Sequence, residues 1–271
     1  MTSFIKAMID RIPPPTASDV MLDILSGYGP LGLSVQGLRK RGLVMDISES
    51  NVRVALNRLA NQRKIASPRR GHYAINFSGY ALHEDVENWW RREEQRQDWD
   101  FTWVAVHEPI KVRGKTAQQR MHSRALELRG FRPARPNLHV RPNNLSGGVY
   151  GLRKQLLELG MSDNAVVFGM NSLSRSEEAC ARALWVGSNL INDYRDYLEA
   201  IKQSTKHLAG ISKYEACKES LLLGRSAIRF LLHDPLLPEE LMPGTERKVL
   251  VSEVREYQLS ARELWRNVVP E

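Results

Sequence analysis

Four apolar residues recur at helical spacing between Ser48 and Lys64, and this pattern predicts one amphipathic helix. The four are Val52, Ala55, Leu56 and Leu59. Ser48 is a suitable N-cap, and Glu49 is an acidic residue for the first turn. At about 100° per residue the apolar stripe must face a core, so the opposite side of the helix is left to solvent or to a ligand.

That opposite side carries side chains that can hydrogen-bond to base edges in a major groove. They are Ser50, Arg53, Asn57 and Asn61. Shorter helices are expected before this one, around 18–26 and 35–41, and strand-like runs after it, at 64–66 and 72–77. The turn at 68–71 between those runs is basic. Helix-turn-helix followed by a hairpin predicts a winged helix.

The predicted DNA contacts come from the helix, from its N-terminal turn and from the wing. They are Ser48, Ser50, Asn51, Arg53, Asn57, Arg58, Asn61, Arg69, Arg70 and His72. The alternative is an ordinary solvated helix face and a polar hairpin tip. Arg58 on the helix flank can equally anchor a phosphate or a carboxylate of the same domain.

The basic charge of the chain is concentrated in this segment. Between Gln36 and Tyr73, nine Lys or Arg residues stand against Asp46 and Glu49, which leaves +7 of the formal net charge of +8. A charge gathered on one small region, with the remainder near neutral, is typical of a protein that binds the phosphate backbone.

Several functional classes are disfavoured by absent patterns. No stretch approaches the roughly 20 apolar residues of a membrane span, and the first residues lack the apolar run of a signal peptide, so we expect a cytoplasmic protein without membrane contacts. Cys180 and Cys217 lie far apart, and the seven histidines lack metal-ligand spacing. We therefore expect no metal, no cofactor and no catalytic residues.

The rest of the chain predicts an α+β fold in several parts. Strand, helix, strand, strand, helix, strand are expected at 101–106, 116–129, 131–135, 138–141, 149–159 and 165–170, which is the order of a ferredoxin-like domain. Helical periodicity follows at 177–202, 213–233 and 247–268. The expected domains are a winged helix-turn-helix at 1–80, a linker helix at 81–98, a ferredoxin-like domain at 99–173 and a C-terminal α-helical domain at 174–271.

Three landmarks in this order resemble the PaaX-like repressors of phenylacetate degradation. They are Val52-Arg-Val-Ala-Leu-Asn-Arg-Leu with its wing, Trp99-Asp-Phe-Thr-Trp103, and Asp234-Pro-Leu-Leu-Pro-Glu-Glu-Leu-Met-Pro243. The third is the most specific, because many regulators share a winged helix. Its Pro-rich composition is open to two interpretations, a helix-breaking structural corner or a ligand contact.

The resemblance implies a central Cas2-like domain and a homodimer that binds an inverted-repeat operator in double-stranded DNA. It further implies repression of an aromatic-compound catabolic operon, relieved by an aryl-CoA thioester such as phenylacetyl-CoA. The effector would bind away from the DNA face, between the central and helical domains. After Pro243 the chain reads Gly-Thr-Glu-Arg, without the tryptophan-containing stretch of that family. We therefore assign no effector-binding residues.

Two alternatives belong to other classes. A Cas2-like fold can be a metal-dependent nuclease, and Asp100 lies close to the first strand of the central domain; however, two-metal hydrolysis needs several converging acids. The neighbouring strands offer Arg132, Arg135 and Arg141 instead. The other alternative is a winged-helix adaptor that senses no small molecule. We expect a regulator and not an enzyme.

Overall fold

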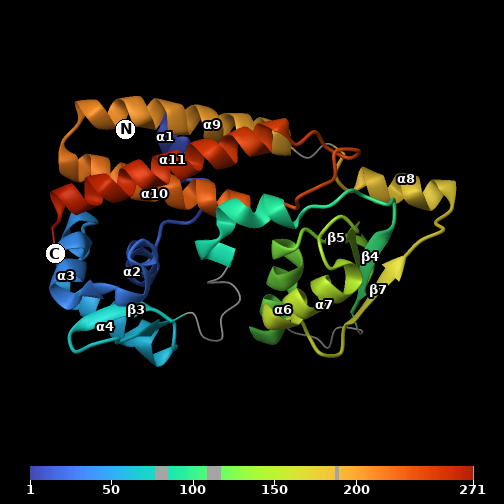
Figure 1. Ribbon diagram of the computed structural model, residues 1–271, viewed down its shortest axis with the longest axis horizontal. Helices are drawn as coiled ribbons and strands as arrows, with labels where there is room; N and C mark the ends of the chain where they lie inside the picture. Colours follow the sequence, from blue (N-terminus) through green and yellow to red (C-terminus); the bar gives the residue numbers. More distant parts are fainter. Residues whose placement is uncertain (77–84, 109–116, 187–188, 271) are drawn as a thin grey trace. The chain divides into compact units, whose positions relative to one another are not determined.

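The structure is a computed structural model that describes residues 1–76, 85–108, 117–186 and 189–270. It contains helices and two small antiparallel sheets, which confirms the α+β class (Figure 1). The chain forms two compact units, one made of Met1–Tyr80, Asp193–Arg229 and Val249–Glu271, the other of Ala81–Asn192 and Phe230–Lys248. These units are compact groups of contacting residues and do not test domain boundaries along the sequence, so the four expected domain ranges stay a prediction.

The first unit begins with short helices and a three-stranded sheet. Its elements are α1 (Ser3–Ile9), α2 (Ala17–Ser26), the 3-10 helix η1 (Gly29–Leu31), β1 (Leu33–Ser34), α3 (Val35–Val44), α4 (Glu49–Asn61), β2 (Ile65–Ala66) and β3 (His72–Ile75). The strands are ordered β1-β3-β2 and are antiparallel. The helices and the hairpin around α4 follow the sequence expectation. α1 and the two-residue β1 are additions too short for periodicity to predict.

Side-chain caps define where these helices begin. Thr16 and Asp19 form a capping box at α2, and the hydroxyls of Ser34 and Ser48 accept from the backbone three residues later in α3 and α4. The turn between α3 and α4 passes through Asp46, whose φ is 56°. Left-handed backbone at an aspartate is compatible with a tight turn.

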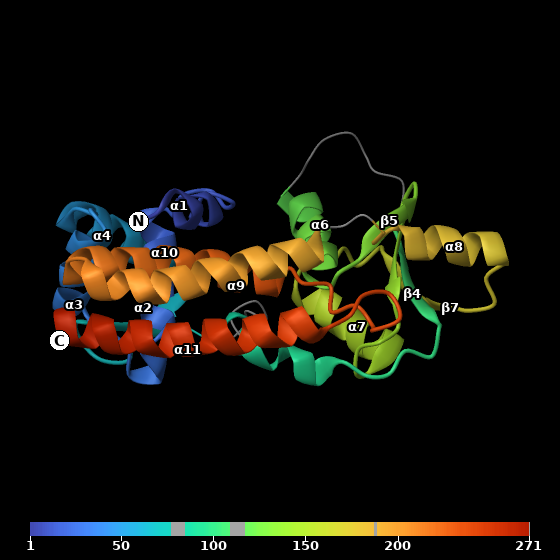
Figure 2. The ribbon, with the colours of Figure 1, turned by 90° about the horizontal axis from the view of Figure 1, so that it is seen from above.

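Three long helices complete the first unit and run side by side in both views (Figures 1 and 2). They are α9 (Leu190–His207), α10 (Lys213–Leu232) and α11 (Thr245–Val268), with the 3-10 helix η3 (Leu208–Gly210) between the first two. A few terminal residues of each helix belong to the second unit. The Tyr197 hydroxyl of α9 lies 2.9 Å from the Ser226 hydroxyl of α10, which joins two of them through a buried contact.

Apolar residues of α10 and α11 enter the core of the N-terminal elements. Cys217 of α10, Trp265 of α11 and Val269, which follows α11 directly, are buried in the same cluster as Val52 and Leu56 of α4. The C-terminal helices therefore contribute part of the hydrophobic support beneath α4. Sequence periodicity predicted each helix but not this meeting of their apolar faces.

The second unit is built on a four-stranded antiparallel sheet. Its elements are β4 (Trp103–His107), α6 (Ala117–Leu128), β5 (Arg132–Arg135), β6 (Leu138–Pro142), α7 (Gly148–Glu158) and β7 (Val166–Met170). The sheet order is β5-β6-β4-β7, so the first strand lies between the third and the last. Val104, Val106 and Val167 face a core shared with residues of α6 and α7.

Two expectations for the flanking segments are corrected. In the part of 80–97 that the structure describes, residues 85–87 are α-helical, a turn follows, and 89–95 form the 3-10 helix η2 (Trp89–Gln95), so the segment is not one continuous α-helix. The helix expected at 177–202 is interrupted, because α8 (Arg175–Ala183) and α9 are separate. Periodicity can continue across a short break in a helix, so only the course of the backbone reveals these two interruptions.

Candidate nucleic-acid interface

Helix α4 has one buried face and one exposed face, as the sequence predicted. Val52, Ala55, Leu56 and Leu59 are the buried residues. The predicted base-contacting residues are all exposed: Ser50, Arg53, Asn57 and Asn61, together with Arg58 and Asn51. Burial of the stripe fixes the rotation of the helix, and that rotation directs the polar side chains outward.

Most of these exposed side chains have no polar partner in the part of the chain that the structure describes. Among the residues that the structure describes, none forms a hydrogen bond or ion pair with the side chains of Arg53, Asn57, Arg58 or Asn61. The intradomain carboxylate considered for Arg58 is therefore not found in that part of the chain. Long polar side chains without internal partners keep their donors and acceptors available for a ligand.

The N-terminal turn of α4 is organised locally. Ser48 accepts a hydrogen bond from the backbone N–H of Asn51 at 3.3 Å, and its hydroxyl lies 3.0 Å from that of Ser50. Glu49 forms an ion pair with Arg39 of α3. Ser48 thus has a structural role as the cap, and its proposed DNA contact would be additional to that role.

Sequence reasoning missed one residue on the exposed face. Val54 is 65% exposed, although it is a β-branched apolar residue in the middle of α4. It lies four residues after Ser50, three before Asn57 and four before Arg58, so it is surrounded by the predicted contact residues. Its spacing from Ser50, Asn57 and Arg58 in the sequence already places Val54 on the same helix face.

The wing is a tight turn between β2 and β3. Arg69 and Arg70 are exposed, whereas His72 is half-buried. Nη2 of Arg69 donates to Nε2 of His72 at 2.7 Å, and the backbone N–H of His72 donates to the carbonyl of Arg69 at 3.1 Å. Gly71 has a φ of 75°, a conformation that glycine adopts without cost. The wing therefore presents two guanidinium groups, one of them held by the histidine.

Not every basic residue of the segment contributes to its surface charge. Arg41 is buried and donates to the Tyr28 hydroxyl at 2.8 and 3.1 Å and to the carbonyl of Gly37 at 3.2 Å. Its guanidinium also lies over the Tyr28 ring, 5.0 Å from the centroid. Because Arg41 is buried, the charge exposed around α4 is smaller than the sequence count of +7. The ion pair of Arg39 with Glu49 leaves that count unchanged, since both charges are already part of it.

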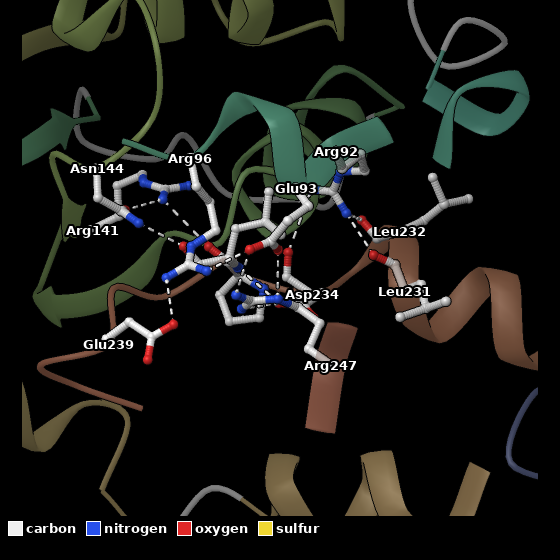
Figure 3. A network of polar contacts seen from close by, with 12 residues as sticks. Arg92, Glu93, Arg96, Arg141, Asn144, Leu231, Leu232, Asp234, Glu239 and Arg247 are labelled. Atoms are coloured by element: carbon white, nitrogen blue, oxygen red, sulfur yellow. Dashed lines mark hydrogen bonds and ion pairs between the residues drawn. The ribbon is translucent and has the colours of Figure 1, made fainter. Parts of the chain in front are cut away.

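A second polar assembly lies within the second unit, around the Asp234 to Pro243 motif (Figure 3). Arg92 donates to the carbonyls of Leu231 and Leu232 at 2.6 and 2.8 Å, where α10 ends. Asn144 donates to the Leu236 carbonyl at 2.7 Å. These bonds satisfy backbone acceptors that a helix end and a Pro-rich turn leave without partners.

Arg141 anchors the same corner. It is 1% exposed and donates to Pro142, to Pro235, to the Asn144 side chain and to the carbonyl of Arg129. Burial, with neighbouring arginines as a smaller cause, lowers its pKa to about 9. The hydrogen bonds offset that desolvation. Of the two interpretations of the motif, the contacts favour the structural corner.

The central sheet does not assemble acids around Asp100. One oxygen of this carboxylate accepts from the backbone N–H and the hydroxyl of Thr102, at 3.0 and 2.6 Å. Within the residues that the structure describes, no group of three or more His, Cys, Asp or Glu side chains is placed to hold a metal ion. The basic residues named beside it differ in setting, since Arg132 and Arg135 are exposed and Arg141 is buried.

A buried carboxylate with two histidines is a feature that sequence spacing did not reveal. Oε1 of Glu108 lies 3.1 Å from Nε2 of His122 and 3.1 Å from Nδ1 of His139. The other ring nitrogen of His122 accepts from the backbone N–H of Ser162 at 3.1 Å. That bond leaves the proton of a neutral His122 on Nε2, facing Glu108, and such a nitrogen is not available to a metal.

None of the helices in the described ranges combines the length and the apolar composition needed to cross a membrane.

No protein-family model matches the chain. The chain is 27% identical over 214 residues to the transcriptional repressor PaaX of Escherichia coli K12, which covers 74% of this chain and 65% of that protein. The match thus spans less than two thirds of the curated relative.

The fold also has a counterpart among solved structures. The uncharacterized protein Rv0674 from Mycobacterium tuberculosis superposes with a TM-score of 0.57 at 17% identity, covering 93% of this chain and 98% of that one. At this identity the likeness concerns the fold alone. The resemblance to PaaX-like repressors that the sequence motifs indicated is confirmed by the named relative.

Proposed function

We propose that this similarity to a repressor reflects a shared activity, and that the chain is a DNA-binding regulator of transcription and not an enzyme. In this proposal α2, α3 and α4 with the β1-β3-β2 sheet form a winged helix, and α4 is the recognition helix. The observation that carries it is the exposed face of α4, where Arg53, Asn57 and Asn61 have no partner among the described residues.

The chemistry of each side chain indicates whether it would contact a base or a phosphate. Arginine pairs with guanine and asparagine with adenine through bidentate hydrogen bonds in the major groove. Arg69 and Arg70 at the wing would contact phosphate or the minor groove, and Arg58 on the helix flank would contact phosphate. Base contacts would provide sequence discrimination, and phosphate contacts most of the sequence-independent affinity.

The finer parts of the proposal rest on the family resemblance. The protein would act as a cytoplasmic homodimer on an inverted-repeat operator, since two recognition helices related by a two-fold axis require a palindromic site. The order β4-α6-β5-β6-α7-β7 with sheet order β5-β6-β4-β7 supports a ferredoxin-like, Cas2-like central domain. The operon would serve catabolism of an aromatic compound, with an aryl-CoA thioester as the effector.

The test uses the full-length protein and a library of random duplexes. Successive rounds of selection should enrich one sequence motif with two-fold symmetry, and titration should give tighter binding to that motif than to a scrambled duplex. Addition of phenylacetyl-CoA should weaken binding to the motif, whereas coenzyme A alone should not. Equal binding to every duplex would overturn the proposed regulator, and binding unaffected by acyl-CoA thioesters would favour an adaptor without an effector.

A further inference from the structure

Val54 is the one large apolar side chain on the outward face of α4. Its side chain is 65% exposed, and the residues at i−4, i+3, i+4 and i+7 are Ser50, Asn57, Arg58 and Asn61. Side chains three and four residues away are its nearest neighbours on the helix surface. Asn61 lies on the same face, two turns further along the helix. Single exposed apolar residues are common and need no explanation by themselves. Val54 differs from such residues by its position, because it lies within the polar face proposed to contact bases.

Helix stability does not account for a valine at this position. A β-branched residue loses side-chain freedom in a helix, so alanine, lysine or glutamate would stabilise an exposed site of α4 more. Nor does packing account for it, since the buried stripe of α4 consists of Val52, Ala55, Leu56 and Leu59. The side chain therefore contributes little to the fold in its free state.

A major groove offers one apolar group, the C5 methyl of thymine. An isopropyl group among hydrogen-bonding side chains matches that methyl and no other base edge. We infer that Val54 contacts the methyl group of a thymine in the DNA site and thereby specifies a T·A pair. This inference rests on the proposed function, and it adds a recognition element that hydrogen bonding cannot supply.

The helix geometry also limits where that thymine lies. Side chains three residues apart on one face have Cβ atoms roughly 5 to 6 Å apart. Successive base pairs are about 3.4 Å apart along the duplex. The thymine that Val54 contacts should therefore lie within about two base pairs of the base that Asn57 contacts.

The experiment replaces thymine by uracil, which removes the methyl group and leaves the hydrogen-bonding edge intact. The duplex is the motif selected by the full-length protein, with each thymine replaced in turn. For the native protein, uracil at one position per half-site should weaken binding by on the order of fourfold, the value of one apolar carbon group withdrawn from contact. Val54→Ala should bind the thymine and uracil duplexes equally at that position.

Two further variants separate this role from others. Leu43→Ala removes a comparable side chain that is 55% exposed on α3, and it should keep the native preference for thymine. Val54→Thr retains one methyl group and should keep part of the preference. Val54→Ala should fold normally, because alanine is the better helix former.

The outcomes are distinct. If Val54→Ala retains the full difference between thymine and uracil, or if no uracil replacement affects the native protein, the inference is overturned while the proposed function stands. If selection enriches no sequence, the proposed function fails and the inference with it. A change in self-association of Val54→Ala without a change in thymine preference would assign the residue to a protein interface and overturn the inference.

Discussion

His72 holds Arg69: Nε2 of the half-buried histidine lies 2.7 Å from Nη2 of the wing arginine. The sequence marked both as DNA contacts, and the structure gives the histidine a partner within the wing. Removing the ring should leave Arg69 free to move, and the lost hydrogen bond should weaken binding to all duplexes by a factor of about two to ten. Titration of His72→Ala and Arg69→Ala on the same duplexes tests this, and a larger loss for His72→Ala would indicate that the histidine itself contacts DNA.

Replacing Arg69 and Arg70 together by alanine should change the salt dependence of binding. Each phosphate contact releases about one counterion, so the slope of log K against log salt should fall by about one to two units, on selected and random duplexes alike. Binding measured at several salt concentrations provides the slope. Arg135→Ala, an exposed arginine on the sheet of the second unit, is the control. An unchanged slope for the double variant would exclude the wing from the interface.

Arg53→Ala and Asn57→Ala should each weaken binding to the selected motif by about 1 to 3 kcal/mol and affect random duplexes much less. Both side chains are exposed on α4 without internal partners among the described residues, so their removal should not destabilise the fold. Competition between the motif and a random duplex measures the difference. Equal losses on both would identify these residues as backbone contacts.

Trp265→Ala should destabilise the first unit by about 3 to 5 kcal/mol, because this α11 residue is buried in the core that supports α4. Leu259→Ala on the same helix removes a side chain that is 52% exposed and should change stability by at most about 0.5 kcal/mol. Urea unfolding of both variants provides the comparison. Comparable stability of the two would contradict the packing of α11 in this core.

The same packing means that deletion of everything after Ser174 is a poor test of effector sensing. Such a fragment lacks Cys217, Trp265 and Val269, three members of the core beneath α4. Loss of DNA release in the fragment would then reflect an altered DNA-binding region as well as a missing sensor. Full-length variants are required to separate the two.

The two cysteines should differ in reactivity. Cys180 is exposed, whereas Cys217 is buried beneath α3 and α4, and burial raises its pKa to about 11. The native state therefore holds Cys217 as an unreactive thiol at pH 8, and an aromatic disulfide reagent should titrate one thiol per chain. After unfolding it should titrate two. Rapid reaction of both thiols in the native protein would show that α10 does not pack as described.

Much of the region around α4 was predictable because its signals are local. The apolar stripe from Val52 to Leu59, the cap at Ser48 and the glycine in the wing each act within a few residues, and the structure has the helix, the cap and the turn at those positions. Exposure of Arg53 and Asn57 follows from the same periodicity. The strand and helix order of the central region was predicted for the same reason.

Other properties depended on contacts between distant parts of the chain. Sequence counting made Arg41 a surface charge, but in the structure it is buried and donates to the Tyr28 hydroxyl. Periodicity predicted α10 and α11 but not that they complete the core beneath α4. The spacing of the histidines in the sequence likewise did not predict that His122 lies next to Glu108.

The physical reason is the same in each case. The period of a sequence determines which face of a helix or strand is apolar, because backbone geometry is local. Which apolar faces meet depends on how the whole chain closes and excludes water, and that follows from all the contacts at once. The sequence by itself determined the polar face of α4, and only the tertiary structure decided what supports that face and which of the nearby charges remain at the surface.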